Sequence, residues 1–346
     1  MKLTELFGIR FPIIQAPMAG AQAGAMAVAV SNAGGLGSLP CAVLTPEGLR
    51  KELDHIKAQS DKPYNVNFFC HAEAEVDPAR ESKWRETLAP HYKHFGIDAA
   101  TIPTGAGRAP FSDEFADVLE SYRPPVVSFH FGLPSPQLLA RVKSWGSKIL
   151  SSATTVDEAR WLEGHGVDAI IAQGLEAGGH RGIFLTDDLT TQVGTFSLLP
   201  QVIRAVKSPV IAAGGIADAQ GVAAAMALGA AGVQIGTAYL LCPESLISTI
   251  HRQALKSNAA RHTALTNIFT GRPARGIVNK VMRELGVINP LAPAFPLATS
   301  AIAPLRAKAE AAGTGDFSPL WSGQNATGCK EIPAGDLTRE LAAKLL

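Results

Sequence analysis

The chain of 346 residues has few cysteines, no excess of charge of either sign and no long hydrophobic run. The four cysteines are far apart and lack CxxC spacing, so we expect neither a zinc site nor a disulfide framework, and we predict no bound metal. Lysine and arginine (31) balance aspartate and glutamate (30), which gives no electrostatic reason to expect a nucleic acid partner. No segment has the length of a membrane span or the pattern of a signal peptide. We therefore expect a cytoplasmic protein without a membrane partner.

Several motifs of nucleotide-binding and hydrolytic enzymes are also absent. No GxGxxG follows a strand, and GxxxxGK[ST], GxSxG and HExxH do not occur. The chain therefore carries no Rossmann fingerprint for a nicotinamide cofactor.

Glycine-rich segments are the most informative feature that is present. Residues 172–182 (AQGLEAGGHRG) follow an apolar run and place backbone N–H groups beside the imidazole of His180. An anion or a flavin needs such donors at the end of a strand. Segments 210–216 (VIAAGGI) and 232–238 (GVQIGTA) each run from an apolar strand into a glycine turn. In a (β/α)8 barrel the loops after strands seven and eight form the usual phosphate site, and these two turns match that position.

A barrel requires six further strands ahead of these two. Short apolar runs typical of a sheet buried on both faces occur at 13–15, 36–39, 65–68, 126–130, 148–151 and 169–172. Helix-like stretches separate the strands. Examples are 157–164, between the fifth and sixth strands, and 219–228, between the seventh and eighth. Alternation of this kind favours a parallel sheet, and we predict an α/β fold of the (β/α)8 TIM barrel type.

The length predicts more than a barrel, because a barrel of this type uses roughly 250 residues. We assign 1–239 to the barrel, with an insertion at about 70–124, and 240–320 to a smaller, mainly helical lid or cap. Residues 321–346 are expected to return to the barrel. Prolines between 289 and 296 forbid a long regular helix there.

Eight segments together carry a resemblance to a known family. They are PIIQAPMAG (12–20), NVNFF (65–69), SFHFG (128–132), the three glycine-rich segments already described, and FTGRPAR (269–275) with LWSGQ (320–324). The chain resembles the nitronate monooxygenases, formerly called 2-nitropropane dioxygenases, and within them class I. QAPM and AGG also occur in relatives with other activities. SFHFG together with AQGxEAGGHRG is much more specific to this family.

The resemblance implies an FMN enzyme that oxidises alkyl nitronates with O2 to nitrite and an aldehyde or ketone. Propionate 3-nitronate, a toxic respiratory inhibitor, is the implied physiological substrate, so the activity would be a detoxification. Glycine turns can bind the cofactor phosphate through backbone N–H groups, and amide side chains at strand ends can bind the flavin ring or ribityl chain. The expected cofactor-binding residues are Ala16, Pro17, Met18, Asn67, Gln173, Gly178, Gly179, Gly214, Gly215, Gln234, Ile235, Gly236, Thr237 and Gln324.

His180 is the expected catalytic residue. A histidine titrates near neutral pH, so His180 can remove the acidic Cα proton of a neutral nitroalkane or, when protonated, bind the anionic nitronate. The sequence leaves these two roles open. His130, at the end of the fourth strand, is a candidate for orienting the substrate, and a core histidine with satisfied hydrogen bonds is an equal alternative.

Two other functions remain as alternatives. One is an NAD(P)H-dependent FMN reductase on the same barrel, such as an enoyl-thioester or quinone reductase. The other is a flavin or phosphate-ligand binding protein without turnover, which has no need of His180 beside the glycines. The oligomeric state is left open, with a homodimer as one assembly.

Overall fold

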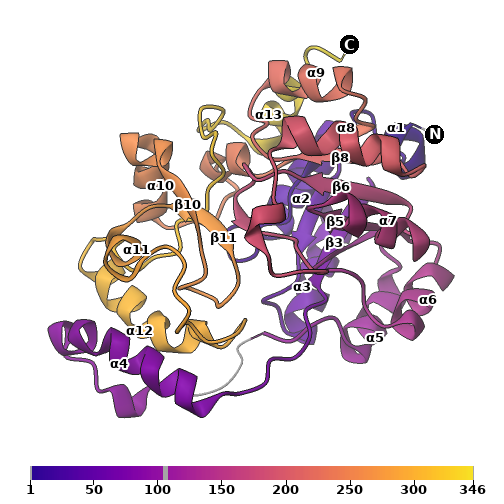
Figure 1. Ribbon diagram of the computed structural model, residues 1–346. Coiled ribbons are helices and arrows are strands. Elements are labelled where there is room, and N and C mark those ends of the chain that lie inside the picture. The colour runs from indigo at the N-terminus through magenta and orange to yellow at the C-terminus, as the bar shows by residue number, and fades with distance from the viewer. Residues whose placement is uncertain (1, 104–107, 346) are drawn as a thin grey trace.

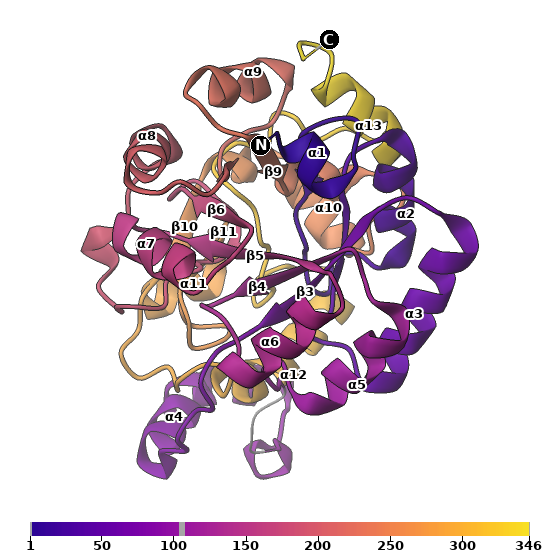
Figure 2. The same ribbon diagram turned by 90° about the vertical axis from the view of Figure 1, so that its right-hand side faces the viewer.

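The computed structural model describes residues 2–103 and 108–345, so part of the insertion lies outside the described residues. A parallel sheet is rolled into a barrel, and Figure 2 shows helices arranged in a ring around its strands. A second group of elements, which contains α10 (Thr249–Lys256), α11 (Lys280–Leu285) and α12 (Ala298–Ala311), lies to one side of the barrel (Figure 1). The (β/α)8 fold predicted from the alternating pattern is confirmed.

The barrel strands agree with the predicted runs to within two residues at each end. They are β1 (Ile13–Gln15), β2 (Gly37–Pro40), β3 (Tyr64–Phe69), β4 (Val126–His130), β5 (Lys148–Ala153), β6 (Ala169–Gln173), β8 (Val210–Ala213) and β9 (Gly232–Ile235). The helices between them are α2 (Gly24–Ala33), α3 (Pro46–Gln59), α5 (Asp113–Tyr122), α6 (Pro136–Ser144), α7 (Val156–Gly164), α8 (Thr195–Ala205) and α9 (Ala219–Ala227). Asp218 caps α9, because its carboxylate accepts a hydrogen bond of 2.8 Å from the Gly221 N–H.

The strands follow the order β1-β9-β8-β6-β5-β4-β3-β2, with every neighbouring pair parallel. One parallel bridge between Ile14 and Leu36 joins β1 to β2. The carboxyl ends of all eight strands therefore meet at one mouth, where active sites of such barrels form.

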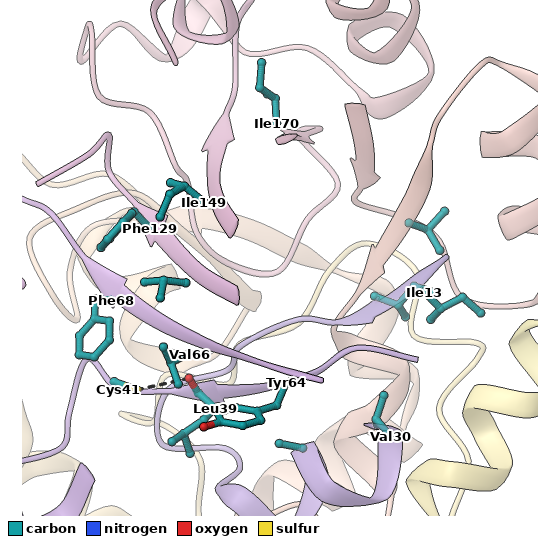
Figure 3. Close-up of a cluster of buried hydrophobic side chains, with 14 of the residues drawn as sticks. Ile13, Val30, Leu39, Cys41, Tyr64, Val66, Phe68, Phe129, Ile149 and Ile170 are labelled. Carbon is teal, nitrogen blue, oxygen red and sulfur yellow. Dashed lines mark hydrogen bonds between the residues drawn. The ribbon is translucent and has the colours of Figure 1, made fainter. Parts of the chain in front are cut away.

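Side chains from alternate strand positions pack outward against the helices. Figure 3 shows part of this layer, with Ile13, Leu39, Val66, Phe129 and Ile149 among the buried residues. The opposite positions form a second buried cluster that includes Ile14, Val126, Leu150, Ile171 and Ile211. Burial on both faces explains why these strands are nearly continuous apolar runs.

The short helix α1 (Leu3–Phe7) contributes to this second cluster. Its Leu3, Leu6 and Phe7 are buried with side chains of the barrel strands. Gly232, at the start of β9, would place a Cβ only 2.4 Å from the Leu3 side chain, so α1 packs at the amino ends of the strands. A ligand must therefore enter from the opposite end of the barrel.

The region after β9 is not only helical. It contains the helices α10 (Thr249–Lys256), α11 (Lys280–Leu285) and α12 (Ala298–Ala311), and also the strands β10 (Thr263–Thr266) and β11 (Ala274–Ile277). These strands form an antiparallel sheet with the two-residue β7 (Gly179–His180), which leaves the barrel after β6. The cap sheet thus incorporates the segment that carries His180.

Two segments distant in the sequence join this region to the barrel. Helix α4 (Pro78–Phe95) of the insertion packs against α12, and Trp84, Leu88, Ile302 and Leu305 share one buried cluster. The last helix, α13 (Ala334–Leu341), packs against α2 of the barrel. Within the described residues, no helix has both the length and the apolar character needed to cross a membrane.

Candidate active site

A cavity of about 570 Å³ opens at the carboxyl ends of the barrel strands and extends under the cap. Its volume lies in the range of cofactor and small-molecule sites. Most of the sequence-predicted residues line it: Ala16, Pro17, Met18, Asn67, His130, Gln173, Gly178, Gly179, His180, Gly214, Gly215, Gln234, Gly236 and Thr237. The cap contributes side chains from α10, α12 and the loop that precedes Gly323.

The two glycine turns present unused backbone donors to the cavity. Within the described residues, no protein acceptor is paired with the N–H of Gly215 or Gly236. Gly215 has φ +74°, a left-handed conformation that residues with a side chain rarely adopt. The side-chain oxygen of Gln234 is also buried without a partner among the described residues. The two N–H groups can donate to an anionic ligand, and the Gln234 oxygen can accept from a donor on the same ligand.

Packing within the protein, and not close approach of a ligand, requires glycine at position 178. A Cβ there would lie 2.5 Å from the backbone nitrogen of Gly323. The Gly323 N–H in turn donates to Thr237 Oγ1 at 2.9 Å. The 176–178 turn and the C-terminal segment therefore pack backbone to backbone beside the eighth-strand turn.

Two of the predicted cofactor-binding residues do not line the cavity. Ile235 is buried on β9, and its neighbours Gln234 and Gly236 reach the cavity instead because successive residues of a strand face opposite sides. Gln324 is exposed, while its backbone N–H donates to the carbonyl of Glu176 at 2.9 Å. The C-terminal segment does reach the cavity, but through Gly323 and Asn325.

The amide groups of Asn67 and Gln173 are bonded within the protein. Asn67 Nδ2 donates to Ser128 Oγ at 2.9 Å. Gln173 Nε2 donates to the carbonyl of His180 at 3.0 Å, and its Oε1 accepts from the Gly182 N–H at 2.7 Å. Gln173 therefore fixes the position of β7 relative to β6. Its role toward a cofactor stays a prediction.

His130 also uses its ring nitrogens within the protein. Nε2 lies 3.1 Å from the carbonyl oxygen of His180, which can only accept, so Nε2 carries the proton. Nδ1 lies 3.1 Å from Ser152 Oγ and is left to accept. Burial lowers the pKa of His130 to about 4. This geometry favours the alternative of a neutral histidine that supports the backbone of His180.

His180 belongs to the cap sheet, through β7, and lines the cavity at the barrel mouth. Its ring is surrounded by Phe69, Phe131, Phe295 and Trp321, with ring centroids 5.4 to 6.1 Å away. Burial is the main cause that holds its pKa well below the ordinary value, and the nearby Arg108 guanidinium is the next. The imidazole is therefore neutral at pH 7.

The surroundings of His180 are cationic. Arg108 lines the cavity, and no ion pair to a carboxylate is found for it within the described residues. The guanidinium carbon of Arg272 lies 4.0 Å from the centre of the Phe131 ring. Phe131 itself has φ +69°, which is unusual for a bulky residue and strains the backbone next to the site. No group of three or more potential ligand side chains suited to a metal occurs in the described parts of the chain.

Sequence reasoning missed the residues that surround His180. Arg181 is fully buried and donates to the carbonyls of Gln173 and Gly174, which holds the 174–181 segment at the end of β6. Thr270 and Trp321 both lie in segments that carried the family resemblance, so the signal was present without a role attached. Arg108 had no sequence signal, because its place in the cavity depends on how the insertion folds back.

An eight-stranded barrel with a covered, glycine-lined cavity and a neutral histidine at its mouth defines a barrel enzyme. The family model described as "Nitronate monooxygenase" matches residues 1–344. The chain is 43% identical to the nitronate monooxygenase of Paraburkholderia phytofirmans over 99% of this chain and 94% of that protein. The chain therefore belongs to the nitronate monooxygenase family, whose members are flavin-dependent oxidoreductases.

Solved structures agree with this assignment. The nitroalkane oxidase from Streptomyces ansochromogenes is 38% identical, with a TM-score of 0.88 over 99% of this chain and 97% of that one. FabK from Thermotoga maritima is 30% identical, with a TM-score of 0.73 over 99% of this chain and 94% of that one. The likeness to the nitroalkane oxidase is thus the greater of the two.

Proposed function

We propose that the protein binds FMN in this cavity and oxidises alkyl nitronates with O2 to nitrite and an aldehyde or ketone. Propionate 3-nitronate is the proposed physiological substrate, which would make the activity a detoxification. Membership of the nitronate monooxygenase family supports the reaction class. The observation that carries the proposal is the convergence of free glycine N–H donors and a neutral histidine on one cavity.

The residues present fit FMN. A phosphate can accept from the N–H groups of Gly215 and Gly236, and the side-chain oxygen of Gln234 can accept from a donor on the cofactor, since none of the three has a partner among the described residues. Backbone groups of 16–18 lie on the same cavity wall, where Met18 offers soft contact to a ring system. The chemistry that FMN supplies when bound is electron transfer from the nitronate to O2.

The protein's own residues account for substrate binding. The guanidinium of Arg108, free of a carboxylate partner in the described structure, is suited to an anionic nitronate or to the carboxylate of propionate 3-nitronate. The aromatic side chains around His180 exclude water from the place where the substrate carbon would lie. His180 is neutral, so toward a neutral nitroalkane it can accept a proton. A pre-formed nitronate needs no base.

An NAD(P)H-dependent reductase is the weaker alternative, since FabK is less similar than the nitroalkane oxidase in both identity and TM-score. A homodimer and a cytoplasmic location stay predictions.

The proposal is tested by identifying the cofactor and the products. The purified protein should be yellow, and heat should release FMN that chromatography identifies. With propionate 3-nitronate in air it should consume O2 and release nitrite, and both should stop when O2 is removed. A colourless protein that takes up no added FMN, or one that releases no nitrite, would contradict the proposal.

A further inference from the structure

The hydroxyl of Thr270 has two hydrogen-bond partners at the edge of the cavity. His180 Nε2 lies 3.0 Å from Thr270 Oγ1, and the Thr270 hydroxyl donates to the carbonyl oxygen of Arg272 at 3.3 Å. Thr270 is only 4% exposed and lies in the loop between β10 and β11. It is therefore held in place away from solvent, next to the ring of the candidate catalytic residue.

These two contacts determine which ring nitrogen of His180 carries the proton. A carbonyl oxygen can only accept, so the single hydroxyl proton of Thr270 is directed at Arg272. Toward His180 the hydroxyl then presents a lone pair. Nε2 must donate to it, and because the imidazole is neutral, Nδ1 is left unprotonated.

The remaining nitrogen is free to meet a substrate. His180 lines the cavity, and Nδ1 makes no hydrogen bond within the described residues. The backbone of the same residue is also fixed, because its carbonyl accepts from both His130 and Gln173. Ring orientation and backbone position are thus set by separate groups.

We propose that Thr270 is a positioning residue that holds His180 as the Nε2–H tautomer and directs Nδ1 at the substrate carbon. The catalytic part of this statement rests on the proposed function, whereas the tautomer does not. Toward a neutral nitroalkane, the Cα–H bond breaks, the proton moves to Nδ1, and the electron pair remains on the substrate as the nitronate. A hydroxyl is a neutral partner, so it orients the ring without the stabilisation of an imidazolium that a carboxylate would give.

The tautomer can be read directly by NMR. In protein labelled with ¹⁵N-histidine, long-range ¹H–¹⁵N spectra distinguish the two tautomers, and His180→Asn identifies the signals of His180. The expected result for the FMN-bound protein is protonated Nε2 and unprotonated Nδ1. A His180 ring protonated on Nδ1 would overturn the proposal.

Two substitutions at Thr270 test its positioning role. Thr270→Val keeps the shape but removes the acceptor, so we expect mixed tautomers and a loss of roughly tenfold in kcat/KM for nitroethane. Pre-formed ethyl nitronate, which has no proton to remove, should change much less. Thr270→Ser keeps the hydroxyl and should retain both the tautomer and the rate. Unchanged tautomer and rate in Thr270→Val would also refute the proposal.

Failure of the proposed function would look different. If neither nitroethane nor any nitronate is turned over while wild-type His180 still carries its proton on Nε2, the activity assignment is wrong and the role of Thr270 in setting the tautomer stands.

Discussion

At the scale of single residues, the site depends on histidines kept neutral by burial. His180 and His130 both have lowered pKa values, and desolvation is the first cause for each. They differ in what their nitrogens do: both ring nitrogens of His130 are bonded within the protein, while Nδ1 of His180 has no such partner in the described structure. One histidine supports the site and the other is available for chemistry.

His180→Asn should therefore separate two classes of substrate. We expect the variant to keep its flavin and to lose roughly 10²–10⁴-fold in turnover of neutral nitroalkanes, the usual contribution of a positioned general base. The loss with pre-formed nitronate should be smaller. Steady-state kinetics with nitroethane and ethyl nitronate measure both, and His94→Asn, at an exposed position of α4, is the matched control. Equal losses with both substrates would mean that His180 binds the anion and does not act as a base.

At the scale of elements, the barrel could be predicted and the cap sheet could not. Strands such as Val126–His130 are apolar because both faces are buried, and that pattern is visible in the sequence. The two-residue strand Gly179–His180 has no pattern of its own and exists only because it pairs with β11, nearly a hundred residues later. Arg108 and Thr270 were missed for the same reason, since long-range packing places their side chains in the site. Gln324 shows the converse, because its segment reaches the cavity through Gly323 and Asn325 while its own side chain does not.

The turn after β8 should be essential for cofactor binding. Gly215→Val introduces a β-branched side chain at φ +74° and places a Cβ 3.4 Å from Glu176, next to the N–H proposed to hold the phosphate. We expect loss of FMN from the purified protein, measured by absorbance at the flavin maximum. Gly146→Val is the control, because Gly146 has φ +84° with open space around it and lies outside the cavity. A Gly215→Val protein that retains full flavin would refute the phosphate assignment.

At the scale of the whole molecule, buried neutral histidines make the stability of barrel and cap depend on pH. Burial lowers the pKa of His130 and of His251 to about 4 each. His251 belongs to α10 of the cap, and its Nε2 lies 3.1 Å from the carbonyl of Trp321. Both parts of the molecule should therefore respond to pH.

The direction of the response follows from the lowered pKa values. Between pH 6.5 and about 4 these histidines are protonated in the unfolded chain and neutral in the folded protein. The free energy of unfolding is therefore highest above pH 6.5 and decreases as the pH falls toward 4. We expect the free energy of unfolding to decrease by about 2 kcal/mol for each of these two histidines between pH 7 and pH 5, a range chosen above most carboxylate titrations. Urea unfolding at several pH values measures it, and His251→Asn should show a smaller slope. A flat profile over this range would contradict burial of neutral histidines.

If the proposed function is right, the nitronate itself supplies electrons to a flavin bound at the barrel mouth. The most direct test is anaerobic stopped-flow absorbance of the flavin-loaded protein. On mixing with propionate 3-nitronate, the flavin absorbance should bleach or redden within seconds, and NADH or NADPH should act slowly or not at all. Rapid reduction by either nicotinamide, with none by the nitronate, would contradict the account and place the protein among the reductases.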